Sequence, residues 1–390
     1  MTSTCSSATE TWNGRAWGQT LRERRSWHSK PRYTRAVAET AIRSVEPIEG
    51  LIAAAQAGDN EAFRHITEPY YRELHMHCYR MLGSFHDAED AVQETFVRAW
   101  RGLATFQSRA QFRSWLYKIA TNACLRQIER RPSRVLSREY GPPADPTLPP
   151  SPPVSEIVRL EPYPDLLLGD QETSSPDPET VYILRESIEL AFLAAIQLLP
   201  GRQRAALLLR DVLGWRASEV ANLLECSVAS VNSALQRARA NLAERLPRGE
   251  EDGASRVVSV AAERSLVAQY MRAWEEGDMN ALAAILREDA VLTMPPASTW
   301  FQGRAAIAAF FHSLCFSQIR KRFRVLATRA NGLPACAAYE RDADDGHYTF
   351  NGIMVLRLEG NLVAEITGFG DPYLFRSFGL PEILDPDETP

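Results

Sequence analysis

The sequence predicts a multidomain fold in which two all-α domains precede a C-terminal α+β domain. In residues 49–132 and 179–249, apolar residues recur at three- and four-residue steps, as on one face of a helix. Residues 133–178 between them are rich in proline, which lacks an N–H donor and fixes φ, so helices cannot continue there. Residues 257–380 combine helical periods with strand-like runs that turn residues separate.

The composition is that of an ordinary globular protein. The chain has 390 residues, enough for two or three domains, with 45% hydrophobic and 24% charged residues. No stretch approaches the roughly 18 uninterrupted apolar residues of a spanning helix, and the N-terminus lacks the apolar core of a secretory signal. The six cysteines form no C-x-x-C pair. We therefore expect reduced thiols, a cytoplasmic location and no membrane contact.

The net charge of −5 is spread unevenly along the chain. Residues 49–132 carry 11 basic and 10 acidic side chains, and residues 179–249 carry 9 and 7. The segment 133–178 has 3 basic against 8 acidic residues, and residues 250–390 have 13 against 20. Nucleic-acid binding needs a local basic face and not a basic total, so the acidic total does not exclude DNA as a partner.

Two segments are expected to lie outside the folded domains. Residues 1–48 mix Ser, Thr, Trp and Arg without a period, and we expect a disordered extension with no assigned function. Residues 133–178 have the composition of an acidic, proline-rich linker. Within this linker, Leu160–Leu168 is apolar and aromatic. A pure spacer would not carry such a run, so the run predicts a docking segment.

The C-terminal domain is predicted from its change of period. Helices are expected at about 258–276, 279–287 and 304–315, and strands at about 289–294, 323–330, 335–341, 347–358 and 362–368. Asn331-Gly332, Asp345-Gly346 and Gly360-Asn361 are turn signals between the later strands. Helices followed by an antiparallel meander make an α+β domain.

Residues 210–246 have the pattern of a helix-turn-helix. A short helix at 218–224 is followed by a tight connection and by a longer helix from Val228 to about Leu246. The longer helix is expected to turn these residues inward: Val228, Val231, Leu235, Ala238 and Leu242. Its outward side chains are small, amide or basic, which suits base edges and phosphates in a major groove. The pattern favours DNA binding over an ordinary helical hairpin.

Two further segments have side chains that suit a binding surface but that also occur in ordinary helices. Asp90, Gln93, Glu94 and Arg98 share one face of a helix, which on chemistry alone is a solvated face. Residues 106–122 interleave aromatic side chains with Arg and Lys, a combination that suits unpaired bases because rings stack while cations hold phosphates. The alternative is a helix whose aromatic residues belong to the core.

Together, these three segments resemble the extracytoplasmic-function sigma factors. DAEDAVQETFVRAW (87–100) looks like the polymerase-docking helix of that family, and FRSWLYKIATNACLRQIER (112–130) resembles its promoter-melting segment. LPGRQRAALLLRDVLGWRASEVANLLECSVASVNSALQRARANL (199–242) is similar to its fourth-region helix-turn-helix. The resemblance covers about residues 49–132 and 179–247, and the joint occurrence of the three motifs is more specific than any one of them.

The resemblance implies a promoter-specificity subunit that binds core RNA polymerase, through its β′ clamp and β flap, and promoter DNA. It implies that polymerase is met by Asp90, Gln93, Glu94 and Phe96. It implies that the −10 element is opened and held by Arg113, Trp115, Tyr117 and Lys118. It places on the −35 element Ser230, Asn232, Ser233, Arg237 and Arg239. No cofactor, metal or catalytic residue is expected, and an anti-sigma partner is left open.

The C-terminal domain resembles the SnoaL-like members of the ketosteroid-isomerase-like superfamily, whose NTF2-like fold is a cone with an apolar pocket. The resemblance rests on VAQYMRAWEEGDMNALAAILREDAVLTMPP, FQGRAAIAAFF and GNLVAEITGFGDPYLFRSFGLP. Sigma factors with such a fused domain form a subgroup that includes SigG and SigJ, and RLEPYPDLLL (159–168) resembles the linker motif of SigG-type members. The resemblance implies a regulatory domain, and it leaves a small-molecule ligand in the cone open.

Catalysis is the less favoured interpretation of the C-terminal domain. Candidate acid/base residues are Asp289, His312, Tyr339, Asp342 and His347. No spacing singles one of them out, so we expect no enzyme. His75-Met76-His77-Cys78 is not a metal cluster, because helical residues two apart point to different faces. The alternatives are a SnoaL-like isomerase or cyclase with a helical targeting module, and a one-component helix-turn-helix regulator.

Overall fold

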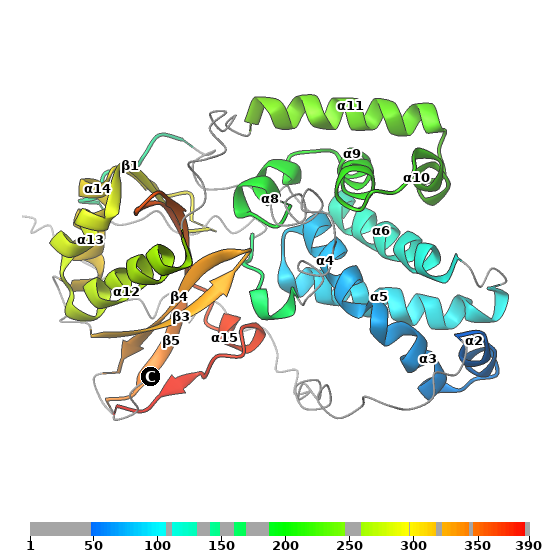
Figure 1. Cartoon of the computed structure of the whole chain (residues 1–390), viewed down its shortest axis with the longest axis horizontal. Coiled ribbons are helices and arrows are strands. Elements are labelled where there is room, and N and C mark those ends of the chain that lie inside the picture. Colours follow the sequence, from blue (N-terminus) through cyan, green and yellow to red (C-terminus); the bar gives the residue numbers. More distant parts are fainter. Residues whose placement is uncertain are drawn as a thin grey trace, which may run out of the picture. The chain divides into compact units, whose positions relative to one another are not determined.

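The structure is a computed structural model of the whole chain (Figure 1). It describes residues 48–106, 111–130, 141–148, 160–168, 187–245, 259–295, 297–316, 322–342 and 346–386. The predicted N-terminal extension, up to residue 47, lies outside the described residues, as does most of the predicted linker. The described part of the linker includes the whole predicted docking segment, residues 160–168.

The first helical domain consists of helices that capping residues begin and end. Its elements are α2 (Ile48–Gln56), α3 (Asn60–Thr67), the 3₁₀ turn η1 (Glu68–Tyr70), α4 (Tyr71–Leu82), α5 (Phe85–Gly102), the 3₁₀ turn η2 (Leu103–Thr105) and α6 (Phe112–Arg130). Asp59 caps α3 by accepting hydrogen bonds from the backbone N–H groups of Glu61 and Ala62. Gly83, at φ 70°, ends α4 in the left-handed region that favours glycine, and Ser84 caps α5.

The second helical domain contains the predicted helix-turn-helix. Its elements are α8 (Leu190–Gln197), α9 (Gly201–Leu207), the π turn η7 (Leu208–Val212), α10 (Ala217–Leu224) and α11 (Val228–Arg245). Four of the residues expected to face inward from α11 are buried: Val231, Leu235, Ala238 and Leu242. The expectation for Val228 is wrong, because its side chain is 43% exposed. A helical side chain covers the turn N-terminal to its own Cα, and the first residue of α11 has no such turn.

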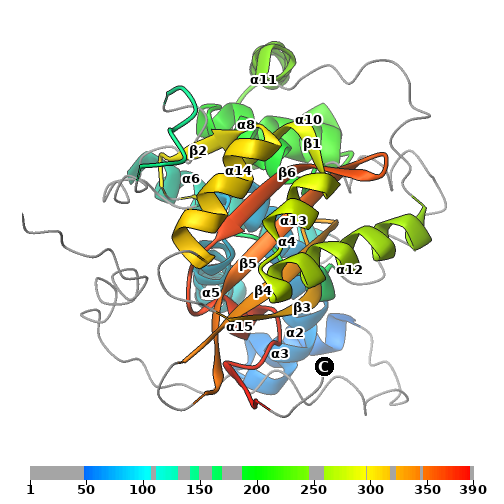
Figure 2. The ribbon, with the colours of Figure 1, turned by 90° about the vertical axis from the view of Figure 1, so that its left-hand side faces the viewer.

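The C-terminal domain is a mixed sheet with helices on one face (Figure 2). Its elements are α12 (Val260–Glu276), α13 (Met279–Ile285), β1 (Leu286–Thr293), β2 (Trp300–Gln302), α14 (Arg304–Phe311), the π turn η8 (His312–Phe316), β3 (Phe323–Ala330), β4 (Leu333–Arg341), β5 (Tyr348–Glu359), β6 (Leu362–Phe369), α15 (Leu374–Ser377) and β7 (Ile383–Leu384). The strand order is β2-β1-β6-β5-β4-β3, and β7 pairs with β5.

The meander from β3 to β6 is antiparallel, as predicted, but β1 pairs with β6 in parallel. This pairing was not predicted, because the two strands are separated by most of the domain sequence. Helices α12, α13 and α14 cover one face of the sheet. Their core is aromatic: ring centroids of Phe301 and Phe310 lie 4.2 Å apart, and those of Trp274 and Phe323 lie 5.3 Å apart. The interior of the cone is therefore occupied by its own side chains.

The β3–β4 turn joins the C-terminal domain to the docking segment through Asn331, which is 0% exposed. Its backbone N–H donates to the carbonyl of Tyr163, and its Oδ1 accepts from the Tyr163 N–H, both at 2.9 Å. Its Nδ2 donates to the Tyr79 hydroxyl at 2.8 Å and to the Ile188 carbonyl at 2.7 Å. We call this set of four contacts the Asn331 junction. The predicted docking segment therefore contacts the C-terminal domain.

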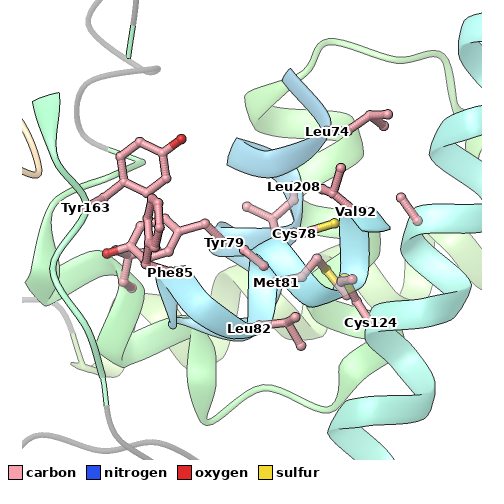
Figure 3. Close-up of a cluster of buried hydrophobic side chains, with 14 of the residues drawn as sticks. Leu74, Cys78, Tyr79, Met81, Leu82, Phe85, Val92, Cys124, Tyr163 and Leu208 are labelled. Atoms are coloured by element: carbon pink, nitrogen blue, oxygen red, sulfur yellow. The ribbon is translucent and has the colours of Figure 1, made fainter. Parts of the chain in front are cut away.

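Aromatic packing surrounds the junction. The ring of Tyr163 lies 4.7 Å from that of Tyr79 and 5.7 Å from that of Phe85, and the three side chains are grouped in Figure 3. Beside them, the carboxylate of Asp165 accepts from the Gly332 N–H at 2.8 Å and meets Arg329 at 3.3 Å. Burial is the largest influence on Asp165 and raises its pKa despite these partners. The docking segment is thus held by buried polar contacts as well as apolar ones.

Replacing Asn331 with glycine should destabilise the folded chain. Glycine tolerates the backbone φ of 56° at this turn, so the change isolates the loss of the amide. The Tyr163 N–H, the Ile188 carbonyl and the Tyr79 hydroxyl would each lose a partner, and each unsatisfied buried group costs about 1–3 kcal/mol. We expect urea unfolding to show a loss of about 3 kcal/mol. Asn361→Gly, in the exposed β5–β6 turn, is the control, and an equal loss there would contradict the assignment.

Candidate functional site

The outer face of α5 presents part of the predicted polymerase set. Asp90 and Gln93 are exposed, and Glu94 is half-buried. Two arginines contact the same oxygen of Glu94: Arg98 on α5, and Arg126 on α6 at 3.3 Å. Two cations thus fix the Glu94 carboxylate in one orientation.

The fourth predicted residue of this set, Phe96, is turned partly inward. It is half-buried, and its ring centroid lies 6.3 Å from that of Tyr71 at the start of α4. Between Gln93 and the C-terminal end of α5, Val97 is 50% exposed. The sequence argument did not select Val97, although an apolar residue at the centre of a polar helix face is a signal for a partner surface.

The docking segment caps the N-terminus of α5. The Glu161 carboxylate accepts hydrogen bonds from the Ser84 hydroxyl at 2.8 Å and from the backbone N–H of His86 at 3.1 Å. The same oxygen lies 3.0 Å from Nδ1 of His86. A carboxylate in this position satisfies free N–H groups and is favoured by the helix dipole. The hydrogen bond to Glu161 raises the pKa of His86 to about 9.

The predicted −10 residues on α6 differ in how exposed they are. Trp115 is half-buried and stacks on Phe106, with centroids 4.6 Å apart. Tyr117 is 0% exposed in the described conformation. Arg113 makes a bidentate ion pair with Glu73, with Nη2 2.7 Å from Oε2.

Two residues of the second helical domain contact this part of α6. The indole of Trp215 lies 5.1 Å from the ring of Tyr117, and the Lys118 ammonium pairs with Glu225 at 2.8 Å. Sequence reasoning missed both contacts. Pattern analysis of a single segment carries no information on which segments meet across domains.

All five predicted −35 residues on α11 are exposed: Ser230, Asn232, Ser233, Arg237 and Arg239. Some of these side chains already have partners within the domain. Arg237 donates to the Ser233 hydroxyl at 2.8 Å, and Arg239 makes a bidentate pair with Asp211 at 2.9 and 2.7 Å. Arg239 is therefore oriented by η7, whereas Asn232 projects from the exposed face. The arrangement suits a helix that enters a major groove.

The candidate acid/base residues of the C-terminal domain are spread over several places. Asp289 pairs with Arg287 at 2.8 Å in an exposed position, and His312 is also exposed. The Tyr339 hydroxyl donates to the Pro381 carbonyl at 2.9 Å, and burial raises its pKa to about 12. Asp342 and His347 lie at the β4–β5 connection, where His347 pairs with Asp385 at 3.2 Å. These positions do not converge on a shared site.

A small cavity lies between the sheet of this domain and the start of α8. It has a volume of about 20 Å³, room for about one water molecule. Its lining includes Arg357, Glu365 and Thr367 of the sheet, with Glu189 and Leu190 at the start of α8. This cavity is too small for an organic substrate.

The His75–Cys78 segment has structural contacts. His75 Nδ1 lies 3.0 Å from the Tyr163 hydroxyl, and His77 Nε2 lies 2.9 Å from Oγ1 of Thr121 on α6. Burial lowers the pKa of His75 to about 4 and that of His77 to about 3, so both are neutral near pH 7. In the described parts of the chain, no three His, Cys, Asp or Glu residues are grouped as a metal site would require. The described helices also include none that is both long and apolar enough to cross a membrane.

Three family models match the chain in the order of its domains. The Sigma-70 region 2 model matches residues 66–134, and the Sigma-70 region 4 model matches residues 189–242. The SnoaL-like domain model matches residues 267–366.

The chain is similar to known proteins over most of its length. It is 40% identical to the ECF RNA polymerase sigma factor SigG of Mycobacterium tuberculosis over 369 residues, which cover 90% of this chain and 95% of that protein. It is 28% identical to the ECF RNA polymerase sigma factor SigW of Bacillus subtilis, covering 51% of this chain and 96% of SigW. The crystal structure of SigJ from M. tuberculosis has the same fold, with a TM-score of 0.51 and 19% identity over 80% of this chain and 98% of that chain.

The His86–Glu161 pair should make the anchoring of the docking segment depend on pH. Because the pKa of His86 is raised above its ordinary value of 6.5, the pair stabilises the fold fully below about pH 6.5 and is lost as pH rises through about 9. An NMR titration should therefore find the His86 imidazole still protonated at pH 8. Glu161→Gln should lower this pKa toward 6.5, whereas Glu244→Gln on α11 should not. A midpoint near 6.5 in the unaltered chain would contradict the pairing.

Proposed function

This chain belongs to the extracytoplasmic-function sigma factors, and we propose that its two helical domains bind core RNA polymerase and a promoter through separate sets of residues. As a member of this family, it is a sigma factor that directs promoter-specific transcription initiation. The observation that carries the assignment is the presence of Sigma-70 regions 2 and 4 in one chain that matches SigG over 90% of its length. Its place of action is the cytoplasm, where polymerase works.

Polymerase binding is assigned to α5. Exposed Asp90 and Gln93 and half-buried Glu94 form a polar surface on which two arginines orient the Glu94 carboxylate, and Phe96 borders it. We place the β′ clamp helices against this surface and the β flap against the second helical domain. A preoriented carboxylate loses little side-chain entropy on binding, which favours a specific contact.

Promoter DNA is assigned to α6 and α11. Opening a duplex costs about 1.4 kcal/mol per base step on average, and each base that stacks on an aromatic ring returns about 1–3 kcal/mol. Trp115 is half-buried and therefore accessible on one side, and Arg113, Tyr117 and Lys118 lie along the same helix. The exposed face of α11, with Ser230, Asn232, Ser233, Arg237 and Arg239, is the −35 reader.

The SnoaL-like domain is a built-in regulator in this proposal and has no reaction of its own. Its interior holds packed aromatic rings, and its candidate acid/base residues are spread over several places in the domain. Its Asn331 junction binds the docking segment, which in turn caps α5. A change that displaces the docking segment would therefore alter the cap of α5. Turnover of a small-molecule panel by the purified chain would favour an enzyme instead.

Glu94→Lys should abolish co-elution of the purified chain with core polymerase in gel filtration. The change reverses the charge on the proposed docking surface and places a third cation beside Arg98 and Arg126. Glu61→Lys, on the exposed side of α3 in the same domain, is the matched control and should co-elute normally. Normal co-elution of the Glu94 variant would remove α5 from the proposal. Tight duplex binding by the free chain, with no polymerase dependence, would favour a one-component regulator.

Arg329→Ala should change run-off transcription with core polymerase while leaving the chain folded. Arg329 bonds Asp165 of the docking segment and Glu263 of α12 from a partly exposed position, and such pairs contribute at most about 1 kcal/mol. We expect output to rise about two- to fivefold as docking weakens, the factor that corresponds to 0.5–1 kcal/mol. Deleting residues 250–390 should change output more strongly. Arg322→Ala is the control, and unchanged output from both the deletion and Arg329→Ala would exclude a regulatory role.

A further inference from the structure

Three side chains assigned above to the −10 element are already engaged in the folded chain. Arg113, Tyr117 and Lys118 lie on one side of α6, which we call the melting face. Each of them contacts a residue of the second helical domain. These residues are Trp215, which precedes α10, and Glu225, which follows it.

Trp215 is held firmly in its position. It follows Gly214, whose φ of 68° turns the chain out of η7, and its N–H donates to the Leu209 carbonyl at 2.9 Å. Arg210 donates to the Trp215 carbonyl, and the Trp215 side chain is 7% exposed. The sequence therefore fixes an indole ring at the surface where the second helical domain meets α6.

The contacts of Trp215 on α6 have the chemistry of a nucleobase contact. Its indole lies 5.1 Å from the Tyr117 ring, and the Arg113 guanidinium lies 5.9 Å from the indole and 4.9 Å from the Tyr117 ring. Proteins hold unpaired bases by the same combination of an aromatic ring and an arginine cation. An indole is a flat bicyclic ring of about the size of a purine, so it can occupy the space of a base.

Glu225 contacts the same face as a phosphate would. It stands in the left-handed conformation, at φ 53°, in the connection between α10 and α11, and its side chain is largely exposed. The carboxylate lies 2.8 Å from the Lys118 ammonium, and its hydrogen bond to Lys118 lowers the pKa of Glu225. Lysine meets a backbone phosphate through the same kind of charged contact.

We propose that the second helical domain occupies the melting face as an internal substitute for an unpaired DNA strand, with Trp215 in the place of a base and Glu225 in the place of a phosphate. A single strand and the second helical domain then compete for Arg113, Tyr117 and Lys118. The proposal rests on the assignment of α6 to the −10 element under Proposed function. It adds that this chain must separate α6 from Trp215 and Glu225 before α6 can hold an open strand.

The test measures binding of a single strand to the full chain without polymerase. The probe is a fluorescein-labelled oligo-dT of about 12 nucleotides, a length typical of single-strand sites, followed by fluorescence anisotropy at low salt. Glu225→Gln keeps the shape of the side chain and removes its charge, so it should bind the probe about two- to fivefold more tightly than the unaltered chain. The slope of log Kd against log salt should steepen by about 0.7, the contribution of one additional phosphate contact to a single strand.

Two further variants separate competition from a general gain in positive charge. Glu244→Gln, an exposed carboxylate near the end of α11, makes the same charge change away from α6 and should leave the affinity unchanged. Lys118→Ala combined with Glu225→Gln should lose the gain, because the freed phosphate contact is then absent. Trp215→Leu, which removes the base-like ring but keeps an apolar side chain, should also strengthen probe binding. If this variant does not fold, the Glu225 series still decides the question.

The outcomes are distinguishable from a failure of the proposed function. Equal affinity of Glu225→Gln and the unaltered chain would overturn the competition. An equal gain in Glu244→Gln, or a gain that survives Lys118→Ala, would overturn it as well. Run-off transcription with core polymerase is measured in parallel on the unaltered chain. Transcription without the predicted gain would reject the inference and leave the sigma-factor assignment standing, whereas no transcription would count against that assignment.

Discussion

The described fold depends most on one buried side-chain amide. Asn331 uses its backbone N–H, its amide oxygen and its amide nitrogen to bind three segments that are far apart in the sequence: α4, the docking segment and the residues before α8. A buried polar group is favourable only when all of its partners are present, so the three segments must be in place together for Asn331 to be buried without cost. Apolar packing alone, being non-directional, would not select this single arrangement.

Hydrogen bonds connect the Asn331 junction to α5, and others connect α4 to the second helical domain. The Tyr79 hydroxyl, which accepts from Asn331, donates in turn to the Glu161 carbonyl at 2.8 Å, and the Glu161 carboxylate caps α5. On the other side, Arg204 of α9 donates to the Met81 carbonyl at the C-terminal end of α4, where a cation is favoured by the helix dipole. Helix α4 thus contacts α5, the second helical domain and the turn of the SnoaL-like domain that carries Asn331.

Local patterns predicted most of the elements. The strand expected at 323–330 is β3 residue for residue, and both the helix-turn-helix and the docking segment lie where composition and period placed them. The misses are long-range. The parallel pairing of β1 with β6, the contacts of Trp215 and Glu225 with α6, and the burial of Tyr117 each depend on which distant segments meet. The error at Val228 is different, because helical period places a residue on a face without indicating where the supported part of that face begins.

The packed aromatic rings inside the SnoaL-like domain imply that these residues are constrained by packing and not by a bound molecule. In an enzyme of this shape, residues lining the hollow are retained for their effect on a bound molecule. Here Phe301 stacks on Phe310, Phe310 contacts Phe311, and Phe311 contacts Trp274, so exchanges among these residues are constrained by volume and shape. Substitutions in this interior are then expected to conserve the total side-chain volume, with a larger residue at one position compensated by a smaller one at another. Asn331 cannot be exchanged in this way, because its amide supplies a specific donor and acceptor that changes in neighbouring residues do not replace.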